Sequence, residues 1–194
     1  MRILLVAPPG AGKGTQATRI AGRYGIAHIS SGELLRRHVE RGTAIGREVQ
    51  RFVAAGDLVP DDIVLSVLAE PVLEAAESGG YVLDGFPRTA HQAAVARELS
   101  LTRGVEVQCT VTLEVPHDEL LQRLFGRAQV EGRLDDTRAV ITHRLDVYEE
   151  TGGGLLAYYE EVGVALHRID GIGTPDEVSA RLWDVLDELR PPAP

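Results

Sequence analysis

Cysteine and long apolar runs are both scarce in this chain. Its 194 residues include one cysteine, Cys109, which excludes an intramolecular disulfide and any metal site built from several cysteines. No stretch has the ~20 consecutive apolar residues that a membrane-spanning helix needs. The apolar segment at the start is too short for a secretory signal peptide. We therefore expect a cytoplasmic protein with no membrane partner.

Positive charge is also in short supply. Lysine and arginine together number 20, against 29 aspartates and glutamates, and the formal net charge is −9. A general nucleic-acid surface needs clustered lysine and arginine, and the sequence contains no long basic run, so we expect no nucleic-acid partner. The length and a hydrophobic content of 44% suit one globular domain with a sizeable core, which we expect to be a monomer.

Apolar segments of strand length alternate with segments of helical periodicity. The expected strands are 3–7, 27–30, 81–84, 105–115 and 165–169. The expected helices are 13–24, 33–40, 45–55, 61–77, 91–99, 117–126, 136–161 and 175–189. This alternation predicts an α/β fold in which helices cover both faces of a parallel sheet. Polar residues within 105–115 indicate a strand that is less enclosed than the first one.

Two of the expected helices contain residues that oppose helix formation. Pro71 should end or kink the helix over 61–77 near Glu70. The triplet Gly152-Gly153-Gly154 lies within the segment 136–161, where three interior glycines cost about 3 kcal/mol relative to alanines. We expect a break or a hinge at the triplet, about which the helix would pivot.

A glycine-rich turn follows the first expected strand and opens the first expected helix. It reads Gly10-Ala11-Gly12-Lys13-Gly14-Thr15-Gln16. Glycines let the backbone approach phosphate oxygens, the helix N-terminus adds partial positive charge, and Lys13 adds a full charge. Thr15 offers a hydroxyl to a Mg²⁺ ion carried by the phosphates. The turn predicts that the chain binds a nucleoside triphosphate.

The fit to the generic P-loop pattern GxxxxGK[ST] is imperfect. That pattern has Gly at position 7 and Ser or Thr at position 14, whereas this sequence has Ala7 and Gly14. The alternative interpretation is an ordinary glycine-rich turn between a strand and a helix. A methyl group at Ala7 would distort the loop only if its backbone had a positive φ.

The stretch from Tyr81 to Arg88 places a carboxylate close to an arginine. The expected strand over 81–84 ends in Asp84, which suits a carboxylate that orients magnesium-bound water. The turn Gly85-Phe86-Pro87 then fixes the backbone ahead of Arg88, whose guanidinium can make a two-pronged contact with a phosphate. Taken alone, Arg88 could equally be a solvated arginine after a turn.

Further motifs follow in order along residues 1–190. Ser30-Ser31-Gly32-Glu33-Leu34-Leu35-Arg36 resembles a Ser-Thr-Gly-Asp-x-x-Arg segment, and Asp84-Gly85-Phe86-Pro87-Arg88-Thr89-x-x-Gln92 resembles a monophosphate-site signature. Gly126-Arg127, Gly132-Arg133-x-Asp135-Asp136 and Arg144 resemble a short lid with its arginines. In these motifs the chain is similar to the adenylate kinases of the nucleoside monophosphate kinase family.

The resemblance implies both a fold and an activity. The fold is a P-loop three-layer sandwich with a central five-stranded parallel sheet (core 1–29, 60–125 and 137–190), a helical AMP-binding segment (30–59) and a short lid (126–136) without a zinc site. The activity is reversible transfer of a phosphoryl group from ATP to AMP, giving two ADP, with Mg²⁺ as the cofactor. The implied partners are thus ATP, AMP and ADP.

The resemblance also assigns roles to residues. The implied catalytic residues are Lys13, Arg36, Asp84, Arg88, Arg127, Arg133 and Arg144. The implied ATP-binding residues are Gly10, Ala11, Gly12, Lys13, Gly14, Thr15, Arg123, Arg127 and Gly173. The implied AMP-binding residues are Ser31, Arg36, Asp57, Leu58, Val59, Gly85, Phe86, Pro87, Arg88, Gln92, Arg133 and Arg144. Mg²⁺ would ride on the nucleotide, near Thr15 and joined to Asp84 through water.

Three positions bear on the choice of acceptor. Gln92 and Thr89 stand where UMP/CMP kinases typically have Asn, and Ser31 keeps a hydroxyl where those kinases tend to have alanine, so AMP is favoured. The alternatives are a kinase for another monophosphate, a nucleotide-binding regulator without turnover, and an ATPase switch. Gly173, which the resemblance places near the base of ATP, precedes Thr174 and Pro175. The alternative interpretation of this turn is a simple helix start, with Thr174 as N-cap and Pro175 as the first helical residue, and the two roles are compatible.

Overall fold

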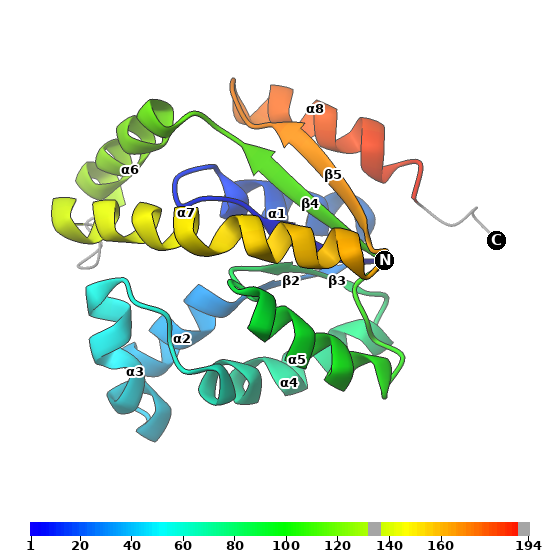
Figure 1. Ribbon diagram of the computed structural model, residues 1–194, viewed down its shortest axis with the longest axis horizontal. Coiled ribbons are helices and arrows are strands. Elements are labelled where there is room, and N and C mark those ends of the chain that lie inside the picture. The colour runs from blue at the N-terminus through cyan, green and yellow to red at the C-terminus, as the bar shows by residue number, and fades with distance from the viewer. Residues whose placement is uncertain (132–136, 190–194) are drawn as a thin grey trace.

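Five strands form one parallel sheet in the order β2-β3-β1-β4-β5. The computed structural model describes residues 1–131 and 137–189. The strands are β1 (Arg2–Val6), β2 (Ala27–Ser30), β3 (Tyr81–Asp84), β4 (Cys109–Glu114) and β5 (Ala165–Asp170). The predicted α/β fold with a central five-stranded parallel sheet is confirmed (Figure 1).

Eight helices are present in the described ranges, and hydroxyl side chains begin many of them. They are α1 (Lys13–Tyr24), α2 (Ser31–Glu40), α3 (Ala44–Ala55), α4 (Asp61–Glu77), α5 (Ala90–Leu101), α6 (His117–Glu131), α7 (Arg138–Glu161) and α8 (Pro175–Leu186). Ser30, Thr43, Thr89, Thr137 and Thr174 each accept a hydrogen bond from a backbone N–H of the helix that follows. Among these helices none is long and apolar enough to cross a membrane.

Alternate residues of the strands enter two separate cores. Ile3 and Leu5 of β1 belong to the core that includes α1, α6 and α8, whereas Leu4 and Val6 belong to the core that includes α2 to α5. Helix α7 contributes to both cores, through Ile141 and Leu145 near its start and Leu155 and Tyr159 near its end. In Figure 1 this long helix passes between the α6 side and the α3 side of the molecule. It thus ties the two layers of helices together.

Strand β4 is buried from Cys109 to Leu113 and exposed only at Glu114, so the expectation of a strand less enclosed than the first is wrong. It begins at Cys109 and lies between β1 and β5, with helices over both faces. The polar side chains of Thr110 and Thr112 are 0% and 2% exposed. The alternation of apolar and polar residues does not reveal a strand's place in the sheet, and threonine suits a central strand because it is β-branched. Burial also raises the pKa of the Cys109 thiol to about 11.

Helix α4 continues through Pro71 to Glu77, so the expected end of the helix near Glu70 is wrong. Val67 and Leu68 before the proline and Ala75 after it are all buried in the same core. Burial of these side chains on both sides outweighs the loss of one backbone hydrogen bond.

Helix α7 likewise runs unbroken from Arg138 to Glu161, so the expected break at the glycine triplet is wrong. Gly152 is buried where a Cβ would lie 3.0 Å from the ring of Tyr148, whereas a Cβ at Gly153 or Gly154 would meet nothing within 4 Å. The first glycine therefore allows close packing, and the other two face solvent.

Two helix boundaries differ from the expected ones at the functional end of the molecule. Helix α2 begins at Ser31 because Ser30 caps it. Helix α6 continues to Glu131 instead of ending at Gly126, so the first residues of the expected lid extend this helix. The expected lid residues 132–136, with Arg133, Asp135 and Asp136, lie outside the described residues.

The double variant Gly153→Ala/Gly154→Ala should be more stable than the natural protein. Each replacement of an exposed glycine inside a helix gains about 1 kcal/mol, so the free energy of unfolding should rise by about 2 kcal/mol in urea titrations. Gly152→Ala, the control, should gain less because its methyl group meets Tyr148. Loss of stability in the double variant would contradict a continuous α7. Reduced turnover without loss of stability would instead support a pivot at the triplet.

Candidate functional site

The carboxyl ends of β1, β2 and β3 bring the sequence motifs to one edge of the sheet. The glycine-rich turn follows β1, Ser30 ends β2, and Asp84 ends β3. The chain passes from β1 to the outer strand β2, returns to β3, and then crosses β1 to reach β4. A reversal of this kind opens a crevice beyond the strand ends, which is where ligands bind in open parallel sheets.

Two cavities open at this edge. The P-loop cavity is lined by the glycine-rich turn, including Gly12, Lys13 and Thr15, and by Arg123. The α3 cavity lies between α3, the β3–α5 turn and α7, and its lining includes Arg88 and Arg144. Lys13, Ser30, Arg36, Asp84, Arg127 and Pro9 line both cavities. The two cavities therefore share a wall that is rich in cations and contains one carboxylate.

The backbone of the glycine-rich turn is shaped to receive an anion. Gly10 and Gly12 have φ values of 85° and 90°, in the left-handed region that favours glycine. A Cβ at Gly10 would lie 2.8 Å from Cγ of Leu124. Gly12 caps α1 without any side-chain hydrogen bond, so the N–H groups of the first turn are left for a ligand.

Ala7 does not strain this turn. Its methyl group is buried, and no described residue other than glycine has a positive φ. Alanine is therefore compatible with the backbone that the structure adopts at this position.

Lys13 is held across the turn by its own backbone. Its Nζ donates hydrogen bonds to the carbonyl oxygens of Ala7 (2.6 Å) and Pro8 (3.2 Å). The pKa of Lys13 is lowered to about 8. Burial is the main cause, Asp84 acts in the opposite direction, and the positive charges of Arg88 and Arg127 contribute to the lowering. An anion beside Nζ would favour the charged form of the lysine.

Arg88 projects from a tight turn into the α3 cavity. Its Nε donates a hydrogen bond to the carbonyl of Gly85 (2.8 Å). Loss of hydration lowers the pKa of Arg88, and the positive charge of Arg144 lowers it further. Gly85 has a φ of 84°, and a Cβ there would lie 2.8 Å from Oγ of Ser31, so the close approach of this turn to α2 requires glycine.

The α3 cavity also has an apolar wall, which sequence reasoning missed. Phe52, Val53 and Val64 line it beside the predicted residues Asp57, Leu58 and Val59. These side chains offer an apolar surface to a planar ring. At the rim, Asp57 Oδ1 lies 2.7 Å from Nε2 of His143, so the segment after α3 contacts α7.

Gln92 lines the α3 cavity and is 2% exposed. Its Oε1 accepts a hydrogen bond from the backbone N–H of Arg88 (2.7 Å), and its Nε2 donates one to Oδ1 of Asp61 (2.7 Å). The backbone N–H of Gln92 donates to Oγ1 of Thr89 (3.1 Å). Nothing in the sequence pattern indicated the contact with Asp61, which is distant along the chain.

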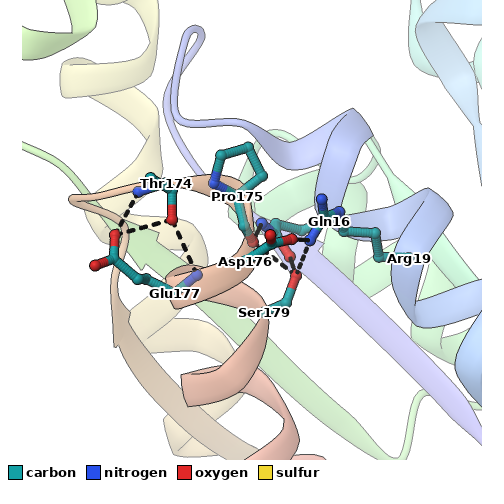
Figure 2. Close-up of polar contacts among 7 residues, drawn as sticks. All are labelled: Gln16, Arg19, Thr174, Pro175, Asp176, Glu177 and Ser179. Atoms are coloured by element: carbon teal, nitrogen blue, oxygen red, sulfur yellow. Dashed lines mark hydrogen bonds and ion pairs between the residues drawn. The ribbon is translucent and has the colours of Figure 1, made fainter.

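Polar contacts join the start of α8 to α1, the helix that follows the glycine-rich turn (Figure 2). Thr174 and Glu177 form a reciprocal cap at the start of α8, which confirms the predicted helix start. Gln16 Nε2 donates to the carbonyl of Pro175 (3.0 Å), and Oγ of Ser179 lies 2.8 Å from Gln16 Oε1 (Figure 2). The start of α8, which follows the loop at 171–173, is therefore held against α1.

Arg123 connects this loop to the P-loop cavity. Its NH1 donates to the carbonyl of Gly171 (3.1 Å), and its Nε donates to Glu119 (2.8 Å). Gly173, which was expected near a nucleotide base, does not line either cavity, although it belongs to the same loop.

The structure brings most of the predicted site residues to the two cavities. The P-loop cavity contains Gly10, Gly12, Lys13, Gly14, Thr15, Arg123 and Arg127. The α3 cavity contains Ser31, Arg36, Asp57, Leu58, Val59, Gly85, Phe86, Pro87, Arg88, Gln92 and Arg144. Ala11 and Gly173 line neither cavity. Sequence reasoning missed His28, which lines the P-loop cavity with Nε2 lying 3.8 Å from Asp84 Oδ2.

Comparison with known proteins gives consistent results over almost the whole chain. The family described as "Adenylate kinase" matches residues 5–164. An adenylate kinase of Thermus thermophilus is 45% identical over 180 residues, covering 93% of this chain and 94% of the relative. An adenylate kinase of Micrococcus luteus is 42% identical over 189 residues, covering 97% and 92%. One from Kocuria rhizophila is 42% identical over 186 residues, covering 96% and 98%.

The affinity for ATP should fall as the pH rises above about 8. The pKa of Lys13 is about 8 in the protein alone. A bound triphosphate favours the charged form of the lysine and so raises this pKa. Above about pH 8, binding of ATP therefore requires the uptake of a proton by Lys13. Below about pH 7 the lysine is protonated in both states and adds no pH dependence.

Calorimetric titrations with ATP and EDTA, from about pH 7 to about pH 9.5, measure this effect. Lys13→Met is the control, because it removes the lysine while the titration of the nucleotide remains. Identical pH dependence in the two proteins would show that Lys13 does not contact the triphosphate.

Proposed function

The chain belongs to the adenylate kinase family and catalyses phosphoryl transfer from ATP to AMP to give ADP. We propose that the P-loop cavity holds ATP and that the α3 cavity holds AMP. The observation that carries this division is the wall that the two cavities share, where Lys13, Arg36 and Arg127 line both. A phosphoryl group passing between two nucleotides needs one continuous cationic surface, because negative charge is present at both ends of its path.

On the ATP side, the backbone of the glycine-rich turn and Lys13 would hold the phosphates. The uncapped N-terminus of α1 and the left-handed glycines support this role. Arg123 and Arg127 would border the nucleotide, with the loop at 171–173 beyond them, since Arg123 contacts both that loop and the cavity.

On the AMP side, Arg36, Arg88 and Arg144 would bind the monophosphate. Gln92 and the backbone at 57–59 would border the base, and Ser31 would lie beside them. The apolar side chains of Phe52, Val53 and Val64 support the binding of a planar base, because they line the same cavity as the polar amide of Gln92.

The reaction needs no general base from the protein. An oxygen of the AMP phosphate, already anionic, attacks the terminal phosphorus of ATP. The bond from that phosphorus to its bridging oxygen breaks, and the electron pair leaves with ADP. Arg88, Arg127 and Arg144, with Arg133 from the segment outside the described residues, would stabilise the charge on the transferring group. The lid (126–136) and the AMP-binding segment (30–59) would exclude water that would otherwise hydrolyse ATP.

Two residues of the P-loop cavity fit a magnesium ion that arrives with ATP. Thr15 and Asp84 both line the P-loop cavity, and Mg²⁺ prefers hydroxyl and carboxylate oxygens to nitrogen. Thr15 would lie beside the ion and Asp84 would act through bound water. When bound, Mg²⁺ would neutralise charge that develops on the phosphate oxygens.

We extend the proposal to the partners and setting of the enzyme. Its partners are ATP, AMP and ADP, and it acts as a cytoplasmic monomer. Its formal net charge of −9 and the lack of a long basic run in the sequence support the absence of a nucleic-acid partner.

Arg88→Ala should lower kcat/KM for AMP by about 10²- to 10³-fold, because it removes a cation that stabilises the reacting phosphate. The measurement is ADP formation from ATP and AMP, with thermal unfolding recorded to show that the fold is intact. Arg103→Ala, which removes an exposed arginine in the turn after α5, is the control and should change kcat/KM by less than about twofold. Near-normal activity in Arg88→Ala would place the acceptor phosphate elsewhere.

A further inference from the structure

The Gln92 amide is held between two partners of opposite chemical type. The backbone N–H of Arg88 can only donate a hydrogen bond, and the carboxylate of Asp61 can only accept one. The backbone nitrogen of Arg88 lies 2.7 Å from Oε1 of Gln92, which accepts its hydrogen bond. Oδ1 of Asp61 lies 2.7 Å from Nε2 of Gln92, which donates to it. If the amide were reversed, its NH₂ group would face the N–H of Arg88 and its oxygen would face the carboxylate of Asp61, and neither pair could form a hydrogen bond. The positions of its oxygen and nitrogen are therefore fixed.

The fixed amide keeps one hydrogen-bonding group free at each end. Nε2 has a second N–H, and Oε1 has a second lone pair. Gln92 lines the α3 cavity, whereas Asp61 does not, so Asp61 acts on the cavity through the amide. The cavity thus presents one donor and one acceptor in a set order.

That order matches one class of purine. Adenine carries an acceptor at N1 beside a donor at its 6-amino group, whereas a 6-oxo purine carries a donor at N1–H beside an acceptor at O6. The same two positions therefore have reversed polarity in the two classes. A base whose phosphate is bound by Arg88 cannot turn over to exchange them. Unmatched polar groups at a buried site lower affinity strongly.

We propose that Asp61 is a positioning residue that makes the acceptor site selective for 6-amino over 6-oxo purine monophosphates, by holding the Gln92 amide in one orientation. The proposal rests on the proposed function, in which the α3 cavity binds the acceptor nucleotide. Its basis is the geometry of Arg88, Gln92 and Asp61, together with the burial of the amide.

Asp61 has other neighbours that the test must separate. It belongs to the first turn of α4, where a negative charge stabilises the helix N-terminus. Its Oδ2 lies 3.9 Å from Nε2 of His91, whose side chain is 78% exposed. Asp62 lies in the same turn and is exposed, so it provides the same charge without the contact to Gln92.

The test compares Asp61→Asn with Asp62→Asn. Asparagine has nearly the same shape as aspartate but can present either a donor or an acceptor to Gln92. In Asp61→Asn the amide orientation therefore depends on the backbone N–H of Arg88 alone. The measured quantity is the ratio of kcat/KM for AMP to kcat/KM for inosine monophosphate, a 6-oxo purine nucleotide. We expect Asp61→Asn to reduce this ratio about tenfold, mainly through a higher KM for AMP, with KM for ATP unchanged.

Asp62→Asn should leave the ratio within about twofold of the natural protein. An unchanged ratio in Asp61→Asn, or an equal loss of activity with both acceptors, would show that Asp61 only stabilises the fold. Thermal unfolding of both variants measures that structural contribution separately. If the natural protein formed no ADP with AMP, the proposed function itself would fail. Activity with AMP and an unchanged ratio in the variant would overturn only the role of Asp61.

Discussion

Accumulation of positive charge at one edge of the sheet is the constraint on which the rest of the site depends. Lys13, Arg36, Arg88, Arg127 and Arg144 line the two cavities around Asp84, although the chain as a whole carries a formal net charge of −9. Burial is the main cause of the lowered pKa values of Lys13 and Arg88, and repulsion between neighbouring positive charges adds to it. Phosphate groups relieve this repulsion, so binding of the substrates and stabilisation of the transferring group have the same electrostatic origin.

The fold supplies rigid supports for these charges. Lys13 begins α1, and Asp84 ends a buried strand. Arg144 lies on α7, a helix that belongs to both hydrophobic cores. Contacts from Gln16 to the start of α8 and from Asp61 to Gln92 then fix the groups that border the two cavities. Each wall of the site is thereby anchored in an element whose position is set by core packing.

Much of this could be predicted from the sequence, because local patterns carry it. The alternation of strands and helices predicted a parallel sheet, although the strand order could not be read from the sequence. The motifs at 10–16 and 84–92 predicted the residues that line the crevice. Three expectations failed for a common reason: enclosure of β4, continuity through Pro71 and continuity through the glycine triplet all depend on tertiary packing. The contact between Asp61 and Gln92 joins distant residues, and neither residue alone indicates it.

The most direct test of the account is ADP formation from ATP with AMP, compared with CMP, UMP, GMP and no acceptor. The account predicts rapid turnover with AMP and little without an acceptor, since the shared wall stabilises transfer between two bound nucleotides rather than to water. Turnover that is equal with and without AMP would identify an ATPase and contradict the account. A preference for another monophosphate would show that the α3 cavity does not select AMP.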